Sequence, residues 1–75
     1  METKVLEIIN EIRVVKGLTP VSVMNPAMTL RDDLNLTSFD LAELTVKLED
    51  EFDIDIFEDG LVSTLGEVFN KLTRI

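Results

Sequence analysis

The sequence predicts an all-α fold: a small three-to-four-helix bundle with a long loop between the first two helices. Three observations support this class. Apolar residues recur at helical spacing in three separate segments, and two of those segments open with a threonine followed three residues later by an acid. The chain has 75 residues, 45% of them hydrophobic, and no cysteine, which suits one thin core without disulfides. We therefore expect a single domain over residues 1–75.

The first helix is expected near residues 3–16. Val5, Ile8, Ile9 and Ile12 follow the spacing i, i+3, i+4, i+7, which places them on one helix face. Gly17 is a plausible stop, because glycine readily takes the left-handed conformation that ends many helices.

Residues 18–36 contain Pro20 and Pro26 and are expected to form a loop. A loop of this length is unusual inside a compact domain, and a mobile loop is one alternative. The apolar residues of this segment favour instead a loop that packs across the ends of the bundle. These residues are Leu18, Val21, Val23, Met24, Met28, Leu30, Leu34 and Leu36.

The second helix should begin at Thr37 or Ser38 and end near Phe52. Thr37 and Asp40 have the spacing of a capping box, in which each residue bonds the other's backbone N–H. The buried stripe is expected to comprise Leu41, Leu44, Thr45, Leu48 and Phe52. Asp40 and most other charged residues of the segment should lie off that stripe.

The segment Asp53–Asp59 alternates acidic and apolar residues as a strand would, but no second strand pattern exists to pair with it. We expect an extended connector, with a short helical turn around Glu58–Val62. The last helix should start after Thr64, which forms a second capping box with Glu67. Its apolar face is expected to comprise Leu65, Val68, Phe69 and Leu72.

The composition excludes several functions. The chain has no histidine or cysteine, which removes Ser-His catalysis, thiol chemistry and ordinary transition-metal sites. A pI near 4.2 argues against binding nucleic acid or anionic membranes. No apolar run is long enough to span a bilayer, and no signal pattern opens the chain. We expect a cytoplasmic monomer that binds no metal.

Ser38 is the most informative side chain. If Thr37 caps the helix, Ser38 lies in the first turn, where free N–H groups and the helix dipole favour a phosphate. The ordinary alternative is that a serine at a helix start only supports capping. No base is placed to activate Ser38, since Lys47 lies nine residues further along and on the opposite face. Ser38 is therefore expected to be a modification site in a protein that is not an enzyme.

The negative charge is concentrated beside this serine. Residues 37–59 contain nine acids and one base, Lys47, and account for the whole formal net charge of −8. An ordinary solvated helix face would intersperse bases among the acids. The asymmetry favours a surface that attracts basic partners.

The segments Leu34–Leu44 and Leu48–Ile56 resemble the acyl carrier proteins. That family's hallmark is Leu-Gly-x-Asp-Ser-Leu-Asp, then Glu-Leu, then Leu-Glu-Glu-x-Phe, and Leu30–Ile56 follows it without a gap. The resemblance implies that Ser38 receives 4′-phosphopantetheine from coenzyme A and that the thiol of this arm carries acyl groups as thioesters. It also implies a phosphopantetheinyl transferase and acyl-processing enzymes of fatty-acid or polyketide-type synthesis as partners, docking through basic patches.

The resemblance further implies two sets of residues. The docking set on the second helix is Phe39, Asp40, Glu43, Val46, Glu49 and Asp50. An acyl pocket between the second and last helices would involve Phe52, Ile54, Ile56, Leu61, Val62, Leu65 and Phe69. Plain core packing is the alternative role for most of this second set.

Three residues depart from the family pattern. Asn35 replaces the usual glycine, Thr37 the usual aspartate and Phe39 the usual leucine. Asparagine tolerates a positive φ, so Asn35 can keep the turn. The larger apolar Phe39 and the neutral Thr37 suggest a specialised carrier with a dedicated set of partners.

Other functions remain open at this stage. An unmodified acidic interaction module explains the helices and the charge. A peptidyl carrier is a nearer alternative, although the glycine-rich lead-in to the serine that such carriers usually show is missing. A calcium-binding loop starting at Asp55 fails, because Phe57 and Gly66 would occupy ligand positions.

Overall fold

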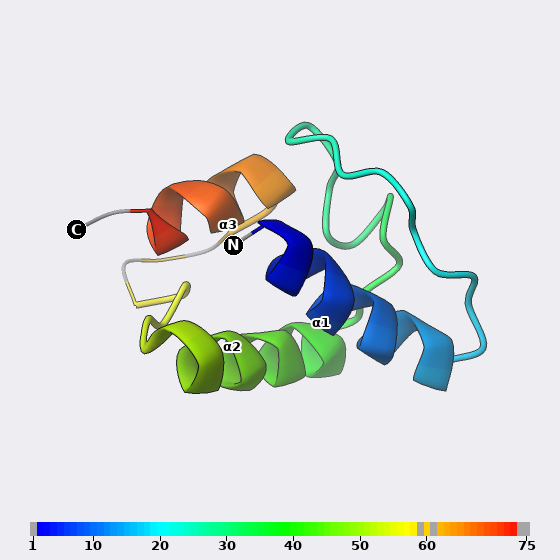
Figure 1. The fold of residues 1–75 in the computed structure, drawn as a ribbon, viewed down its shortest axis with the longest axis horizontal. Helices are drawn as coiled ribbons and strands as arrows, with labels where there is room; N and C mark the ends of the chain where they lie inside the picture. Colours follow the sequence, from blue (N-terminus) through cyan, green and yellow to red (C-terminus); the bar gives the residue numbers. More distant parts are fainter. Residues whose placement is uncertain (1, 59, 61, 74–75) are drawn as a thin grey trace.

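A computed structural model describes residues 2–58, 60 and 62–73 of the chain. It contains three α-helices: α1 (Glu2–Val15), α2 (Ser38–Phe52) and α3 (Leu65–Leu72). Within the described residues there is no named strand, and Thr29 and Thr64 form an isolated antiparallel bridge. α1 packs across α2, and α3 lies on the other side of α1 (Figure 1). The all-α class and the three helices are confirmed.

α1 buries the face that its spacing predicts. Val5, Ile8, Ile9 and Ile12 are each at most 6% exposed. Gly17 ends the helix with φ 85°, and Leu18 N–H donates to the Arg13 carbonyl at 2.9 Å. The positive φ is the conformation for which glycine was expected here.

The loop after α1 packs against the core. Leu30, Leu34 and Leu36 are almost completely buried, and Leu18, Val21, Met24 and Met28 are half-buried. The expectation for Val23 is wrong, because this side chain is 70% exposed. The backbone turns Val23 toward solvent, and isolated apolar side chains are common on protein surfaces.

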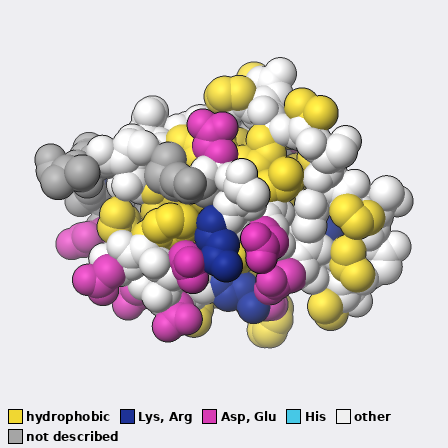
Figure 2. Space-filling view, in the orientation of Figure 1, with side chains coloured by type: hydrophobic (Ala, Val, Ile, Leu, Met, Phe, Trp, Pro, Cys, Tyr) yellow, Lys and Arg dark blue, Asp and Glu magenta, His cyan; other side chains and the backbone are white. Residues whose placement is uncertain are grey.

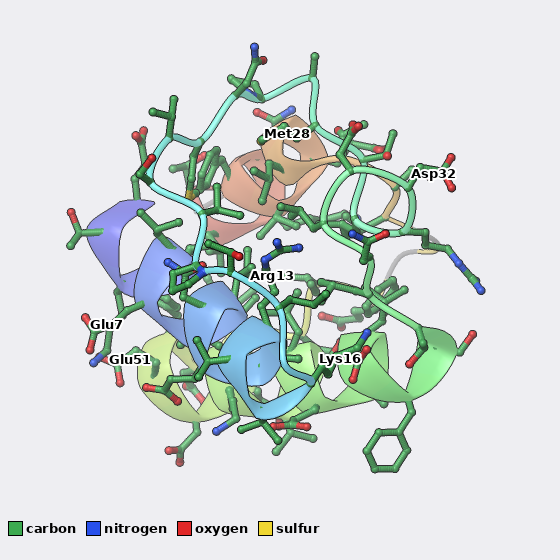
Figure 3. The ribbon with its side chains drawn as sticks, turned by 90° about the vertical axis from the view of Figure 1, so that its right-hand side faces the viewer. Glu7, Arg13, Lys16, Met28, Asp32 and Glu51 are labelled. Atoms are coloured by element: carbon green, nitrogen blue, oxygen red, sulfur yellow. The ribbon has the colours of Figure 1, made fainter. Side chains whose placement is uncertain are left out.

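Two polar side chains of α1 hold this loop. The Asn10 side chain donates to the Val21 carbonyl at 2.9 Å and accepts from Val21 N–H at 2.8 Å. Arg13 is buried, and its guanidinium donates to the carbonyls of Thr19 and Leu34. These bonds satisfy backbone groups that a packed loop would otherwise bury unpaired. Arg13 lies between α1 and the loop in Figure 3.

The loop also joins the start of α3. Leu30 N–H donates to the Ser63 carbonyl at 2.8 Å, and Gly66 N–H donates to the Pro26 carbonyl at 2.9 Å. A Cβ on residue 66 would lie only 3.1 Å from that Pro26 oxygen, so the close approach favours glycine. The loop therefore acts as a structural layer that positions both α2 and α3.

α2 begins and ends where the sequence predicts, but its buried face is rotated. Leu44 and Leu48 are fully buried, whereas Leu41, Thr45 and Phe52 are half-buried. Asp40 was expected off the buried stripe, and this is wrong: it is 7% exposed. The reason is a partner from α1, described below.

The connector after α2 starts at Asp53, which takes a left-handed conformation with φ 60°. Turns follow, with Glu58 N–H donating to the Asp55 carbonyl and Gly60 N–H to the Phe57 carbonyl, both at 3.2 Å. They lie slightly before the expected turn at 58–62, of which residues 59 and 61 are outside the described residues.

α3 begins as expected after Thr64, whose hydroxyl accepts from Glu67 N–H at 3.2 Å. Leu65, Val68 and Leu72 are buried, and Phe69 is half-buried. The predicted apolar face of this helix is therefore confirmed.

Candidate functional site

The capping box of α2 fixes the place of Ser38. Thr37 Oγ1 accepts from Asp40 N–H at 3.2 Å, and an Asp40 carboxylate oxygen accepts from Thr37 N–H at 2.9 Å. Thr37 is therefore the N-cap and Ser38 the first helical residue, as predicted. The Ser38 side chain is exposed, so its hydroxyl stands in solvent at the positive end of the helix dipole.

The turn before the cap depends on Asn35. This residue has φ 58°, as its tolerance of the left-handed region led us to expect. Leu36, next along the chain, is 2% exposed, and its N–H donates to the Leu30 carbonyl at 3.0 Å. A turn followed by a buried anchor delivers Thr37 to its capping position.

Lys16 supplies the partner of the buried Asp40 carboxylate. Its Nζ donates to Asp40 Oδ2 and to the Asn35 carbonyl, both at 2.5 Å. Figure 3 shows Lys16 reaching the first turn of α2 from the end of α1. The bond from Lys16, followed by the bond from Thr37 N–H, holds the pKa of Asp40 below its usual value.

This pairing corrects the expected role of Asp40. The resemblance assigns Asp40 to the docking set, but a buried carboxylate that bonds Lys16 and Thr37 is not displayed to a partner. Sequence reasoning missed Lys16, which lies 24 residues away with no local signal that links the two residues.

Arg31 is a second residue that the sequence did not single out. Its Nη1 lies 3.4 Å from Ser38 Oγ. It also lines a cavity of about 290 Å³. This cavity is lined by Thr29, Arg31, Asp32, Leu41, Val62 and Ser63. The loop, α2 and the segment before α3 thus meet next to Ser38.

The other residues of the expected docking set share one face of α2. Phe39 and Val46 are 78% and 67% exposed, and at positions i and i+7 they lie on one side of the helix. Glu43 and Asp50 continue the same stripe, and Glu49 lies beside it. An open hollow of about 390 Å³ lies on this face and is lined by Val46, Glu49, Asp50 and Asp53.

Lys47 does not neutralise that face. Its Nζ lies 3.6 Å from Glu11 of α1 and 4.0 Å from Glu43. The base is therefore drawn to the seam between α1 and α2, where Figure 2 shows Lys and Arg side chains among acidic ones. The outer face keeps its negative charge.

The expected acyl-pocket residues mostly form core. Ile56, Val62 and Leu65 are buried, and Phe52, Ile54 and Phe69 pack against the same cluster. Leu61 lies outside the described residues. Of this set, Val62 also lines the cavity beside Ser38. An acyl pocket built by these residues stays a prediction.

The chemistry of this site is that of an acceptor. Arg31, the side chain that donates to Ser38 Oγ, is a guanidinium that stays protonated and cannot take the serine proton. In the part of the chain that the structure describes, no group of three or more acidic side chains could hold a metal ion. An exposed hydroxyl at a helix start, beside a cation and a cavity, fits an attached phosphodiester.

This fold and site define a small helical carrier domain with an exposed serine at the start of α2. The chain matches the family described as "Phosphopantetheine attachment site" over residues 4–70, and it belongs to that family. Its members carry a covalent 4′-phosphopantetheine group and are carriers, not enzymes, which confirms both expectations. They interact with phosphopantetheinyl transferases and acyl-processing enzymes.

A curated relative agrees with this assignment. The chain is 31% identical to an acyl carrier protein of Syntrophobacter fumaroxidans over 77 residues, which cover 99% of this chain and 89% of that protein. No solved structure gives a significant match. None of the helices described here is both long and apolar enough to cross a membrane.

Proposed function

We propose that Ser38 is the attachment site, and that the chain delivers acyl thioesters on its phosphopantetheine arm to fatty-acid or polyketide-type synthase enzymes. The observation that carries this proposal is the exposed hydroxyl of Ser38 at the first position of a capped helix. The other serines support the assignment by contrast. Ser22 is in the long loop and Ser63 precedes the cap of α3, so neither begins a helix.

Attachment is a phosphoryl transfer to Ser38. Its Oγ forms a bond to the β-phosphorus of coenzyme A, the bond from that phosphorus to 3′,5′-adenosine diphosphate breaks, and the serine proton leaves. The transferase must supply the base, because the described side chain bonded to Ser38 Oγ is Arg31. The bound arm supplies a thiol, which this cysteine-free chain otherwise lacks.

The test is intact mass after incubation with coenzyme A and a broad-specificity phosphopantetheinyl transferase. Wild type and Ser22→Ala should each gain one prosthetic group, and Ser38→Ala should gain none. An unchanged wild-type mass, or an increment that survives in Ser38→Ala, would contradict the proposal. The first of these outcomes would favour an unmodified interaction module.

We further propose that Phe39, Glu43, Val46, Glu49 and Asp50 dock onto basic patches of partner enzymes. Two exposed apolar side chains beside exposed acids form a surface that combines contact with electrostatic steering. Asp40 is left out, because Lys16 already pairs with it. The chain is proposed to act as a monomeric single domain, so that this face stays open to successive partners.

Charge reversal tests the docking face. Glu49→Lys should slow association with the transferase at low ionic strength, by about tenfold or more, and high salt should shrink the difference. Glu7→Lys makes the same charge change on an exposed position of α1 and serves as the control. Equal slowing by both variants would mean that net charge acts, not this face.

A sheltered acyl chain is a separate proposal. We place it between α2 and α3, with Val62 at the cavity and the remaining expected residues in the adjoining core. Lengthening the acyl chain on the loaded protein should shift the methyl and aromatic resonances of Phe52, Ile54, Val62 and Phe69. Resonances that do not move would show that these residues only pack the core.

A further inference from the structure

Resting on the proposed attachment at Ser38, we propose that Arg31 binds the phosphodiester of the arm and directs the arm over the neighbouring cavity. Arg31 would thus hold the prosthetic group after attachment.

The cations of this acidic chain are mostly engaged elsewhere. Lys4, Lys16 and Lys47 each lie within 4.0 Å of carboxylates, and Arg13 is buried against backbone carbonyls. Arg31 differs. Over residues 2–58, 60 and 62–73 no carboxylate lies within 4.0 Å of its guanidinium, although Asp32 and Asp33 are its neighbours in the chain. Its charge is available to an anion.

One of the two neighbouring acids, Asp33, is engaged within the loop itself. Asp33 accepts from Thr29 N–H at 2.7 Å and from the Thr29 hydroxyl at 3.2 Å, so its carboxylate closes the turn that precedes Leu34. Leu30 and Leu34 anchor both ends of this turn in the core. The backbone of Arg31 is thereby fixed while its side chain is exposed.

The distance to Ser38 suits a phosphate better than a hydroxyl. Arg31 Nη1 lies 3.4 Å from Ser38 Oγ, which is long for a hydrogen bond. In a phosphodiester the non-bridging oxygens lie two bonds beyond Oγ, within reach of this guanidinium. Arginine binds such oxygens in pairs through its planar fork of N–H donors. Thr37, the residue before Ser38, adds no competing negative charge.

The cavity sets the direction in which the arm would lie. Arg31 and Asp32 line it from the loop, Leu41 from α2, and Val62 and Ser63 from the segment before α3. Figure 3 shows Asp32 on the loop layer above the start of α2. A phosphate held by Arg31 places the rest of the arm at the mouth of this cavity, against the apolar Leu41 and Val62.

The test uses the loaded protein and NMR. After mass spectrometry has confirmed loading, the Arg31 Nε–H resonance of the ¹⁵N-labelled protein should shift between unloaded and loaded forms. Arg31→Gln should still load at Ser38, but its ³¹P line should narrow as the phosphodiester gains mobility. Contacts of the arm with Leu41 and Val62 should be lost in the same variant. Arg31→Lys should restore these signals only in part, since lysine lacks the fork.

Lys47→Gln is the matched control, because it removes one positive charge on the side of α2 that faces α1. It should leave the ³¹P line and the arm contacts as in wild type. Two results would overturn the role of Arg31 alone. One is an Arg31 resonance that does not shift when the wild type is loaded. The other is a ³¹P line of the same width in Arg31→Gln as in Lys47→Gln. A wild type that gains no mass would overturn the attachment site and this proposal together.

Discussion

Lys16 is the residue that joins three parts of the chain at the start of α2. Its ammonium group, at the end of α1, bonds the Asp40 carboxylate and the Asn35 carbonyl. Asp40 in turn bonds the N–H of the capping residue Thr37. The position of Ser38 therefore depends on a cation that lies 22 positions before it in the sequence.

Removal of this cation should destabilise the fold. In Lys16→Met the carboxylate of Asp40 stays buried without its main partner, so we expect a loss of about 1–2 kcal/mol in the free energy of unfolding. Lys47→Met breaks an exposed pair and should cost less than about 1 kcal/mol. Urea unfolding measures both, and equal effects would show that pairing with the buried Asp40 adds nothing beyond an exposed ion pair.

The same pair predicts a dependence on pH. The folded state holds the pKa of Asp40 below its usual 3.8, so the carboxylate stabilises the fold above that value. This contribution is lost as pH falls through the folded pKa. The stability difference between wild type and Asp40→Asn should therefore be largest near neutral pH and shrink under acid.

Urea unfolding at a series of pH values measures this difference. Glu49→Gln removes an equal charge from an exposed site and controls for the change in net charge. A wild-type advantage over Asp40→Asn that stays constant into acid would contradict the stabilising role of the ionised carboxylate.

At the scale of elements, threonine caps fix where α2 and α3 start. Each threonine forms a reciprocal capping box with an acid three residues later. For α2, Thr37→Ala should lower the free energy of unfolding by about 1 kcal/mol. Thr37→Asp should keep most of the stability, because a carboxylate oxygen can accept the same N–H bond. Thermal unfolding checks both variants. If Thr37→Ala left the stability unchanged, Lys16 and Asp40 alone would hold the start of the helix.

These elements show what local pattern predicts. The helix bounds, both capping boxes and the positive φ of Asn35 follow from nearby residues, because each depends on spacing or on backbone chemistry within one turn. The packed loop was also predictable, since it contains more apolar residues than a solvated segment would. The prediction that Val23 packs with this loop was wrong, because apolar character alone does not give the direction of a side chain.

The missed parts of the site are contacts between distant segments. The sequence alone suggests that Asp40 is a surface acid, but in the structure Lys16 bonds its carboxylate. The sequence likewise gives no special place to Arg31, which the folded loop brings to 3.4 Å from Ser38 Oγ. Such pairs depend on how the loop layer crosses the helices, which no short pattern encodes. The place of Ser38 at the helix start was predictable, because it depends only on the neighbouring capping residues Thr37 and Asp40.

Across the whole molecule, the charged side chains are distributed unevenly around α2. Lysines at the seam between α1 and α2 pair with acids there, which leaves the outer face of α2 negative around Phe39 and Val46. Figure 2 shows acidic side chains gathered over the α2 side of the molecule. The rest of the chain is a small core and a loop that hold Ser38 at one exposed edge.

This surface leads us to propose a specialised partner set. Phe39 is 78% exposed directly after Ser38, and it would enlarge the apolar contact at the proposed docking face. Phe39→Leu should improve turnover by a housekeeping fatty-acid synthase and its malonyl transferase, while wild type should be a poor substrate. Full turnover of the wild type with these enzymes would contradict the specialised role.

The most direct test of the central claim is the intact mass of the protein loaded from an acyl-coenzyme A, before and after neutral hydroxylamine. Because the chain has no cysteine, a thioester can form only on the arm. We expect one acyl-phosphopantetheine increment on wild type, loss of the acyl part alone with hydroxylamine, and no increment in Ser38→Ala. An acyl group that resists hydroxylamine, or a mass that never changes, would contradict a carrier that acts through Ser38.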